Sequence, residues 1–207
     1  MIHTNGSAGK VLLTCNRYPV VVKIAVLGDS HIASGGLPNG CLLNMVKVGG
    51  FDLLIHVGDL SNEQVLKELG GISRLVVVAG ETDPMPLPDK EIIDVEGVRL
   101  LVIHGHQKEA RLHLRRMVNY FNARLVLMGH THRPMVQDLG GVLVVNPGSF
   151  TGFNGSSETM AILELAGGRI NIRIQGCGWF NEYKYGNLIV RADELTSILS
   201  DLGPASS

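Results

Sequence analysis

The sequence predicts an α/β chain of the layered α+β kind, with two packed mixed β-sheets flanked by helices. In the N-terminal half, apolar runs that suit buried strands alternate with segments that suit helices, whereas the C-terminal half is richer in hairpins. Glycine accounts for 26 of the 207 residues without a repeating period, which is typical of many turns and close backbone approaches. Hydrophobic residues make up 45% of the chain and charged residues 18%, which excludes a disordered chain and a long helical rod.

Three strands and two helices are predicted in the N-terminal half. Residues 20–27 form an almost continuous β-branched run, which favours a strand buried on both faces. Prolines at positions 84, 86 and 88 exclude regular structure after the third strand. The other expected elements are strands at 51–57 and 74–79, a helix at 41–48, and a helix at 62–69 for which Ser61 is the predicted cap.

Hairpins dominate the predicted C-terminal half. Glycine-containing pairs, such as Glu96-Gly97 and Gly140-Gly141, separate short strand-like runs and predict tight turns. Residues 109–122 carry apolar side chains at helical spacing, which predicts a helix. The other expected elements are a strand at 124–128, a C-terminal helix at 192–202, and hairpins of 91–95 with 98–103, 135–139 with 142–145 and 159–165 with 169–175.

We expect residues 1–20 to be a flexible leader and residues 21–207 to form a single domain. Residues 1–23 contain three basic residues and no acid, and their apolar centre at 11–13 is too short for a secretory signal. A transit peptide is the alternative. No apolar run approaches the roughly 18 residues that are needed to span a bilayer. Removing residues 1–19 is therefore expected to leave folding unchanged.

Charge and cysteine content narrow the function classes. The formal net charge of -1 and the lack of a basic stripe argue against nucleic-acid binding. The three cysteines, Cys15, Cys41 and Cys177, are odd in number and form no C-x-x-C motif, which argues against a disulfide framework. We therefore expect a reducing compartment and a cytoplasmic protein.

Metal-capable side chains follow five of the predicted strands, each beside a glycine. A lone Asp or His at a strand end is ordinarily a cap or a loop residue, but five such coincidences indicate a shared site. The carboxyl ends of strands in an α/β sheet meet at one edge, where ligands bind. The clusters are Asp29 with His31, Asp59, Glu81 with Asp83, His104 with His106, and His130 with His132.

This donor set predicts a site for two metal ions. Carboxylates combined with imidazoles suit manganese, iron, cobalt, nickel or zinc rather than calcium, which prefers oxygen alone. A single zinc ion needs only three or four ligands, whereas seven candidates suffice for two ions and a bridging carboxylate. Two such ions clamp a phosphate and activate water for attack at neutral pH.

The motifs follow one another in a characteristic order. They are D-x-H at 29–31, G-D at 58–59, a G-N-x-D-like segment at 80–83, H-G-H at 104–106 and G-H-T-H at 129–132. In this order the chain resembles the calcineurin-like metallophosphoesterases over residues 21–175. More narrowly, it resembles the branch that contains small bacterial and archaeal phosphodiesterases and the metallophosphoesterase-fold subunit of retromer. The N-P-G-S segment of that branch is matched at 146–149.

The resemblance implies a set of metal ligands. Two divalent ions are the implied cofactors, with manganese preferred and iron, cobalt, nickel or zinc as alternatives. Asp59 would bridge the two ions. The other implied ligands are Asp29, His31 and His132 for the first ion, and Glu81, His104 and His130 for the second.

Catalytic and substrate-binding residues are implied in the same way. Asp59, His104 and Asp83 form the implied catalytic set, in which Asp83 orients its neighbours. The implied substrate is a small phosphate ester, above all a phosphodiester. The residues implied to contact it are His106, Asn146, Gly148 and Ser149.

One departure from the family pattern keeps a second function open. Position 81 is normally Asn, which supplies a neutral oxygen, whereas Glu81 adds a negative charge. The retromer subunit also carries an acid there and shares the H-G-H-Q segment found at 104–107, but it tends to lose the bridging aspartate that Asp59 preserves. The sequence therefore predicts a metal-dependent phosphodiesterase. The alternative is a retromer-like scaffold with a vestigial metal pocket and a protein partner, and a homo-oligomer is compatible with either.

Overall fold

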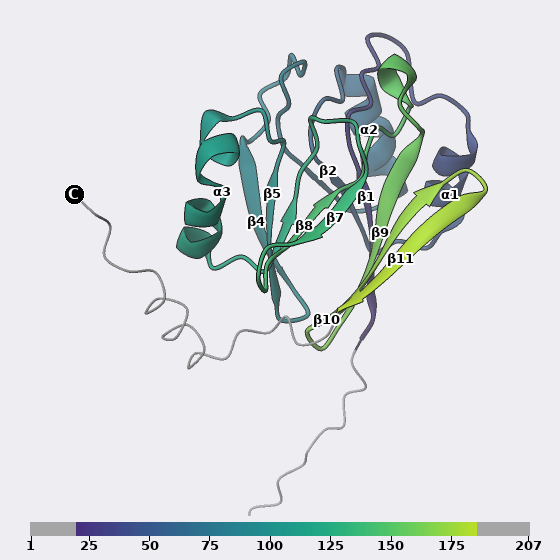
Figure 1. The fold of residues 1–207 in the computed structure, drawn as a ribbon. Helices are drawn as coiled ribbons and strands as arrows, with labels where there is room; N and C mark the ends of the chain where they lie inside the picture. Colours follow the sequence, from purple (N-terminus) through teal and green to yellow (C-terminus); the bar gives the residue numbers. More distant parts are fainter. Residues whose placement is uncertain (1–19, 186–207) are drawn as a thin grey trace, which may run out of the picture.

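The computed structural model describes residues 20–185, which form two β-sheets packed face to face with helices on their outer sides (Figure 1). One sheet has six strands and the other has five, and both mix parallel with antiparallel pairs. The predicted fold class is confirmed. The division between a leader and one domain at residue 20 stays a prediction, and the helix expected at 192–202 lies outside the described residues.

The six-stranded sheet is centred on β1. This strand pairs in parallel with β2 and antiparallel with β9. Ile24 and the three residues after it are fully buried, as the β-branched run predicts. In spatial order the strands are β11 (Trp179–Tyr185), β10 (Arg169–Gly176), β9 (Thr159–Ala166), β1 (Val22–Leu27), β2 (Leu53–His56) and β3 (Leu75–Val77).

The five-stranded sheet has a parallel centre and antiparallel edges. Strands β5, β6 and β8 run in parallel, while β4 and β7 close the two sides as hairpin partners of β5 and β8. In spatial order the strands are β4 (Lys90–Val95), β5 (Val98–Ile103), β6 (Leu125–Leu127), β8 (Leu143–Asn146) and β7 (Met135–Asp138).

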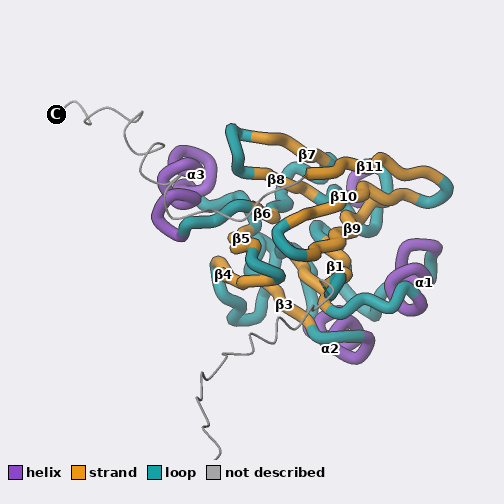
Figure 2. Tube along the Cα trace, turned by 90° about the horizontal axis from the view of Figure 1, so that it is seen from below, coloured by secondary structure: helices purple, strands orange, loops and turns teal. Residues whose placement is uncertain are grey.

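The core lies between the sheets, and helices cover their outer faces. Side chains from both sheets, such as Ile24 and Leu100, form one fully buried cluster between them. Helices α1 (Cys41–Val48) and α2 (Glu63–Ile72) pack on the six-stranded sheet, and α3 (Lys108–Phe121) packs on the other (Figure 2). Within the described part of the chain, no helix combines the length and apolar content that a membrane crossing requires.

The predicted helix cap at Ser61 is wrong. Asn62 caps α2, because its side-chain oxygen accepts hydrogen bonds from the backbone N–H groups of Gln64, at 2.8 Å, and Val65, at 3.1 Å. Ser61 instead turns the chain with a φ of 71° and donates its backbone N–H to Asp83. Ser and Asn cap helices about equally well, so their order in the sequence did not separate them.

The expectation that the chain lacks a disulfide is also wrong. Cys41, the first residue of α1, and Cys177, between β10 and β11, form a disulfide with their Cα atoms 6.0 Å apart. They are 136 residues apart in sequence, so only the fold brings them together. The bond fastens α1 to the hairpin at the edge of the six-stranded sheet. Cys15 lies outside the described residues.

Candidate metal centre

The loops after β1, β2, β3, β5 and β6 meet at one edge of the sandwich. Backbone hydrogen bonds join them directly: Asp29 N–H donates to the carbonyl of Gly58, and Gly129 N–H donates to the carbonyl of His104, both across neighbouring strands. These loops carry all seven residues that the sequence predicts as metal ligands. The carboxyl edge of both sheets is therefore one site, as the placement of the motifs predicts.

Several of these ligand residues adopt the left-handed backbone conformation. This conformation is uncommon for residues other than glycine, although Asp, Asn and His adopt it most readily. Each instance costs of order 1 kcal/mol and persists only where the surrounding structure imposes it. Five such residues on three loops therefore mark a site built for a purpose other than stability. They are Asp29, His31, Asp59, His130 and His132.

The predicted ligands gather into two groups. Asp29, His31 and His132, which we call the first ligand group, present ligand atoms that all lie within 4.8 Å of one another. The same limit holds for Glu81, His104 and His130, the second ligand group. Asp59 joins Asp29 and His104 in a third set of this kind, so it lies between the two groups.

One oxygen of Asp59 faces both groups. Its Oδ2 lies 3.2 Å from Nε2 of His104 and 3.4 Å from Nε2 of His31. Its Oδ1 is occupied, because it accepts hydrogen bonds from the backbone N–H of Thr82, at 2.9 Å, and from the Thr82 hydroxyl, at 3.0 Å. Oδ2 is therefore the oxygen of Asp59 that remains available to a cation, and Asp59 would be the residue shared by the two groups. The role of Thr82 was not predicted, since a threonine between two acids has no metal-binding signature.

His104 passes the test for a metal ligand. Its Nδ1 lies 2.7 Å from the carbonyl of Val57, and a carbonyl only accepts, so Nδ1 carries the proton and Nε2 is free to bind a cation. That Nε2 is buried and has no hydrogen-bond partner among the described residues. A buried nitrogen without a partner costs stability unless something occupies it. The oxygens of Asp59 and Asp29 nearby complete a donor set that fits a divalent cation.

Glu81 points into the site although it is partly exposed. Its Oε2 lies 3.1 Å from Nδ1 of His130, and 52% of its side chain is accessible. The carboxylate therefore reaches the second ligand group rather than turning to solvent. It is the most exposed member of that group.

Asp83 supports the site without entering either group. Its Oδ2 accepts hydrogen bonds from the backbone N–H of Asp59, at 2.9 Å, and of Gly80, at 2.8 Å. Its Oδ1 accepts one from Ser61 N–H at 2.8 Å. With both oxygens engaged, Asp83 holds the backbone of Asp59 in place, and its orienting role in catalysis stays a prediction.

The predicted substrate-binding residues divide into two kinds. The Asn146 amide donates to the carbonyl of Gly129 and accepts from Gly148 N–H, both at 2.8 Å, so it braces the G-H-T-H loop. A side chain at Gly148 would collide with Thr159, and its φ of 79° also favours glycine. The Ser149 hydroxyl donates to the carbonyl of Asp29 at 2.8 Å. These three residues connect the loops.

His106 is the exception among these residues. It is partly exposed, its ring centroid lies 5.3 Å from that of His104, and its buried Nδ1 has no hydrogen-bond partner among the described residues. It is therefore the predicted substrate contact whose ring nitrogen still lacks a hydrogen-bond partner among the described residues. Whether His106 touches substrate stays a prediction.

A buried histidine that the sequence analysis passed over ties two ligand loops together. His56 is fully buried at the end of β2, and its Nε2 lies 2.8 Å from the Ser30 hydroxyl. Its Nδ1 accepts from Gly58 N–H at 3.3 Å, so Nε2 carries the proton and donates to Ser30. Burial lowers the pKa of His56 from 6.5 to about 4, which keeps the ring neutral. A histidine within an apolar strand was the available signal.

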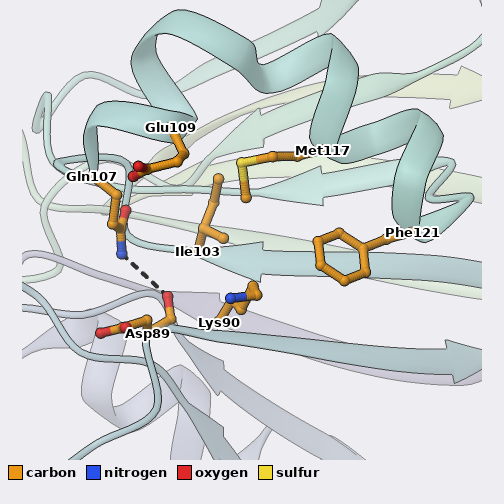
Figure 3. Close-up of a pocket in the computed structure, with 7 residues that line it drawn as sticks. All are labelled: Asp89, Lys90, Ile103, Gln107, Glu109, Met117 and Phe121. Carbon is orange, nitrogen blue, oxygen red and sulfur yellow. Dashed lines mark hydrogen bonds between the residues drawn. The ribbon is translucent and has the colours of Figure 1, made fainter.

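A separate cavity lies beneath α3 and takes no part in the site. It has a volume of about 260 Å³ and an apolar floor of Ile103, Met117 and Phe121 (Figure 3). Gln107 stands between the cavity and the metal centre: its Oε1 accepts from Gly105 N–H and its Nε2 donates to the carbonyl of Asp89. None of the lining residues is a predicted ligand, so the cavity is not the candidate active site.

Comparison with known families decides the identity of the domain. The sequence profile of the calcineurin-like phosphoesterase superfamily domain matches residues 22–168. The chain belongs to this superfamily. The matched residues contain all seven predicted ligands and the N-P-G-S segment.

Relatives of this member of the superfamily include archaeal proteins. A probable metallophosphoesterase of Methanocaldococcus jannaschii is 33% identical over 133 residues, which cover 62% of this chain and 68% of the relative. A phosphodiesterase of the same organism is 24% identical over 160 residues, which cover 69% of this chain and 93% of that protein.

Solved structures share the fold of this chain. Vps29 from Entamoeba histolytica, complexed with zinc, has a TM-score of 0.69 at 23% identity and covers 79% of this chain and 98% of its own. Vps29 from Chaetomium thermophilum has a TM-score of 0.72 at 18% identity, with 83% and 98% covered. At these identities the similarity establishes the fold alone.

The protonation of the candidate metal centre predicts pH-dependent metal uptake. Burial raises the pKa of Asp29 from 3.8 to about 7, although His104 and the backbone N–H of His130 oppose the rise. Below about pH 7 the metal-free protein therefore carries a proton on Asp29, and a cation must displace it. Burial lowers the pKa of His104, but the neighbouring Asp59 and Asp29 outweigh burial and raise it overall.

We therefore expect the affinity for manganese to reach its highest value above about pH 7. Below that pH the affinity should fall by up to about tenfold per pH unit for each proton that the cation displaces. Titration calorimetry at about pH 6, 7 and 8, in buffers of different ionisation enthalpy, measures the affinity and the protons released. An affinity that does not change across this range would contradict the assignment of Asp29 as a ligand.

The hydrogen bonds to Asp59 give a prediction for Thr82. Thr82→Val removes the hydroxyl contact to Oδ1 of Asp59 and leaves the backbone contact. The bridging carboxylate is then less firmly oriented, and we expect manganese affinity to fall about tenfold. Thr82→Ser, which keeps the hydroxyl, is the matched control and should retain most of the affinity. Equal affinities for the two variants would show that the hydroxyl plays no part in metal binding.

Proposed function

We propose that this chain is a metal-dependent phosphoesterase that acts on small-molecule phosphodiesters. The observation that carries the proposal is the arrangement of two ligand groups on either side of Oδ2 of Asp59. Membership of the phosphoesterase superfamily and the phosphodiesterase among the relatives support it. Ser30 is not an activated nucleophile, because its hydroxyl is buried and accepts the hydrogen bond from His56. The residues that matter for the proposal are those that hold cations and phosphate.

Two divalent cations are the proposed cofactors, and manganese is the preferred ion. Each group offers both carboxylate oxygen and imidazole nitrogen, which suits manganese, iron, cobalt, nickel or zinc. When bound, such ions supply Lewis acidity and lower the pKa of the water that attacks phosphorus.

The chain's own residues set the geometry and the charge of this reaction. Asp59 holds the two groups at a fixed spacing, and Asp83 fixes the backbone of Asp59. Burial pushes the pKa of Asp59 upward, but the contacts with His104 and Thr82 outweigh it and hold that pKa below its usual range. The carboxylate is therefore ionised wherever the enzyme works. We assign His106 the contact with a phosphoryl oxygen.

The direct test is metal analysis of the purified protein together with a substrate panel. We expect manganese-dependent hydrolysis of bis(p-nitrophenyl) phosphate, a diester, to exceed that of p-nitrophenyl phosphate, a monoester. The matched negative control is the chain treated with chelator, and added manganese should restore its activity. Absence of turnover on both compounds with metal bound would reject the enzymatic function.

A scaffold function is the second candidate, and an apolar edge favours it. Trp179 and Phe180 on β11 are 41% and 57% exposed, and the acidic Glu81 is the feature that this alternative explains. In that case the chain binds a protein partner or a second copy, and the metal pocket is vestigial. A metal-loaded protein without turnover that forms a stable complex through β11 would establish this function in place of catalysis.

Glu81 gives a prediction that separates metal affinity from turnover. Glu81→Asn removes one negative charge from the second ligand group, so manganese should bind more weakly there. Less ligand charge also leaves a bound cation more acidic, so turnover at saturating manganese should equal or exceed that of the parent. Turnover of bis(p-nitrophenyl) phosphate against manganese concentration measures both effects. Superimposable curves would mean that Glu81 is not a ligand.

We also propose that the protein works in the cytoplasm, on the strength of its odd cysteine number. The disulfide between Cys41 and Cys177 is the feature that bears on this proposal, because reducing compartments disfavour such bonds. Trapping the thiols of the native protein with an alkylating agent at cell lysis tests it. Two modified cysteines at positions 41 and 177 support the cytoplasm, and an unmodified, bonded pair argues against it.

A further inference from the structure

Phe153 is an aromatic residue at the metal centre that the core does not explain. It is partly buried, yet it belongs to none of the three hydrophobic clusters of the described chain. Its aromatic neighbours are two predicted ligands. The ring stacks on His31 with centroids 4.0 Å apart at 27°, and meets His132 at 5.6 Å and 73°.

The loop that carries Phe153 is attached to the first ligand group rather than to the core. Ser149 accepts a hydrogen bond from Phe153 N–H at 2.9 Å through the same hydroxyl that donates to Asp29. The Thr151 hydroxyl donates to the carbonyl of Ser30 at 2.7 Å. The ring is therefore positioned by hydrogen bonds between its loop and the loop that carries Asp29 and His31.

The backbone after Ser149 is shaped to present this ring. Gly152, Asn154 and Gly155 all have positive φ values, of 68°, 52° and 79°, which folds residues 153–155 into a single 3-10 turn. The space next to Gly155 is open, since an added Cβ would meet no atom within 4 Å. The turn thus stands at the rim of the site with room beside it.

The two ends of the site differ in chemistry. The first ligand group is bordered by the phenyl ring of Phe153, whereas no aromatic pair of this kind borders the second group among the described residues. A phosphodiester centred between the groups would extend one arm over each. Only the arm on the first side would then meet an apolar, planar surface.

We propose that Phe153 determines substrate specificity by stacking on a planar aromatic ring, so that aryl or nucleoside phosphodiesters are the substrate class. This inference rests on the proposed phosphodiesterase function. One face of the phenyl ring is taken by His31, and no aromatic residue among residues 20–185 other than His31 and His132 pairs with it. Stacking between aromatic rings adds about tenfold to affinity.

The test compares two ligands that differ only in an aromatic ring. Binding of adenosine monophosphate and of ribose 5-phosphate to the manganese-loaded chain is measured by calorimetry, which needs no turnover. Phe153→Leu keeps apolar bulk against His31 and removes the ring. We expect adenosine monophosphate to bind the parent about tenfold more tightly than ribose 5-phosphate, and Phe153→Leu to abolish this preference while manganese stoichiometry is unchanged.

Phe180→Leu is the matched control, because Phe180 is exposed on β11 and contacts Arg173 instead of a ligand. It should leave the preference intact. If Phe153→Leu lowers the affinity for both ligands equally, the ring only positions His31. If the preference for adenosine monophosphate over ribose 5-phosphate is unchanged, the ring does not contact the base. Either result overturns the inference. Failure of the proposed function appears separately, as a parent that binds these ligands and hydrolyses no diester.

Discussion

Asp59→Asn is expected to lower diester hydrolysis by roughly a thousandfold or more at saturating manganese. The reason is geometric. Oδ1 of Asp59 is already held by Thr82, so Oδ2 is the atom available to both ligand groups. An amide nitrogen in that place has no lone pair for a cation, and both sites weaken at once. Turnover of bis(p-nitrophenyl) phosphate and metal content per chain measure the two effects.

Folding should change far less than activity in this variant. In the metal-free protein Oδ2 of Asp59 lies 3.2 Å from Nε2 of His104, and losing that contact should lower the melting temperature by only a few degrees. Asp94→Asn is the matched control, because Asp94 is an exposed aspartate that pairs with Arg99 outside the site, and its activity should equal that of the parent. Equal turnover of Asp59→Asn and the parent would refute the bridging role.

Removing the disulfide is expected to lower the melting temperature by about 5–15 °C. The bond closes a loop of 136 residues, and a cross-link of this span restricts the unfolded chain by an amount worth about 2–5 kcal/mol. Cys177→Ser and the parent treated with reductant should therefore melt at the same lower temperature. Differential scanning calorimetry measures the change.

The third cysteine provides the control for this experiment. Cys15→Ser keeps the disulfide between the other two cysteines, so its melting temperature should equal that of the oxidised parent. The disulfide fastens α1 to the β10–β11 hairpin and has no contact with the ligand groups, so metal content should stay the same in all variants. Melting temperatures that coincide for the oxidised parent and Cys177→Ser would show that the bond does not stabilise the fold.

The sequence predicts the strands and the ligands because both leave local signals. Residues 20–27 are predicted to form a buried strand because every side chain except that of Lys23 is apolar, and Asp29 and His31 follow closely. The same holds for Asp59 after β2 and for His104 after β5. Where a run of apolar residues ends in a metal-capable residue beside glycine, chain order alone indicates which residues converge.

Features that depend on distant contacts were not predictable in this way. Thr82 and Phe153 matter because of what they touch, and neither residue type marks a metal site. The pairing of Cys41 with Cys177 needs the tertiary fold to bring the two thiols together. Strand β11 was missed as well, because as an edge strand it is exposed along most of its length and lacks the alternating apolar pattern.

Each ligand group contains residues from loops of both sheets, so a bound cation should influence how the protein unfolds. In the first group Asp29 and His31 follow β1 of the six-stranded sheet, whereas His132 follows β6 of the other. A cation bound by this group would cross-link the two sheets at their carboxyl edge. An ion at a hundred times its dissociation constant adds about 2.7 kcal/mol to the free energy of unfolding. Removing the cation with a chelator should therefore affect more than catalysis. The two sheets should undergo local opening independently of each other, and amide hydrogen exchange should rise first along the edge where the sheets meet.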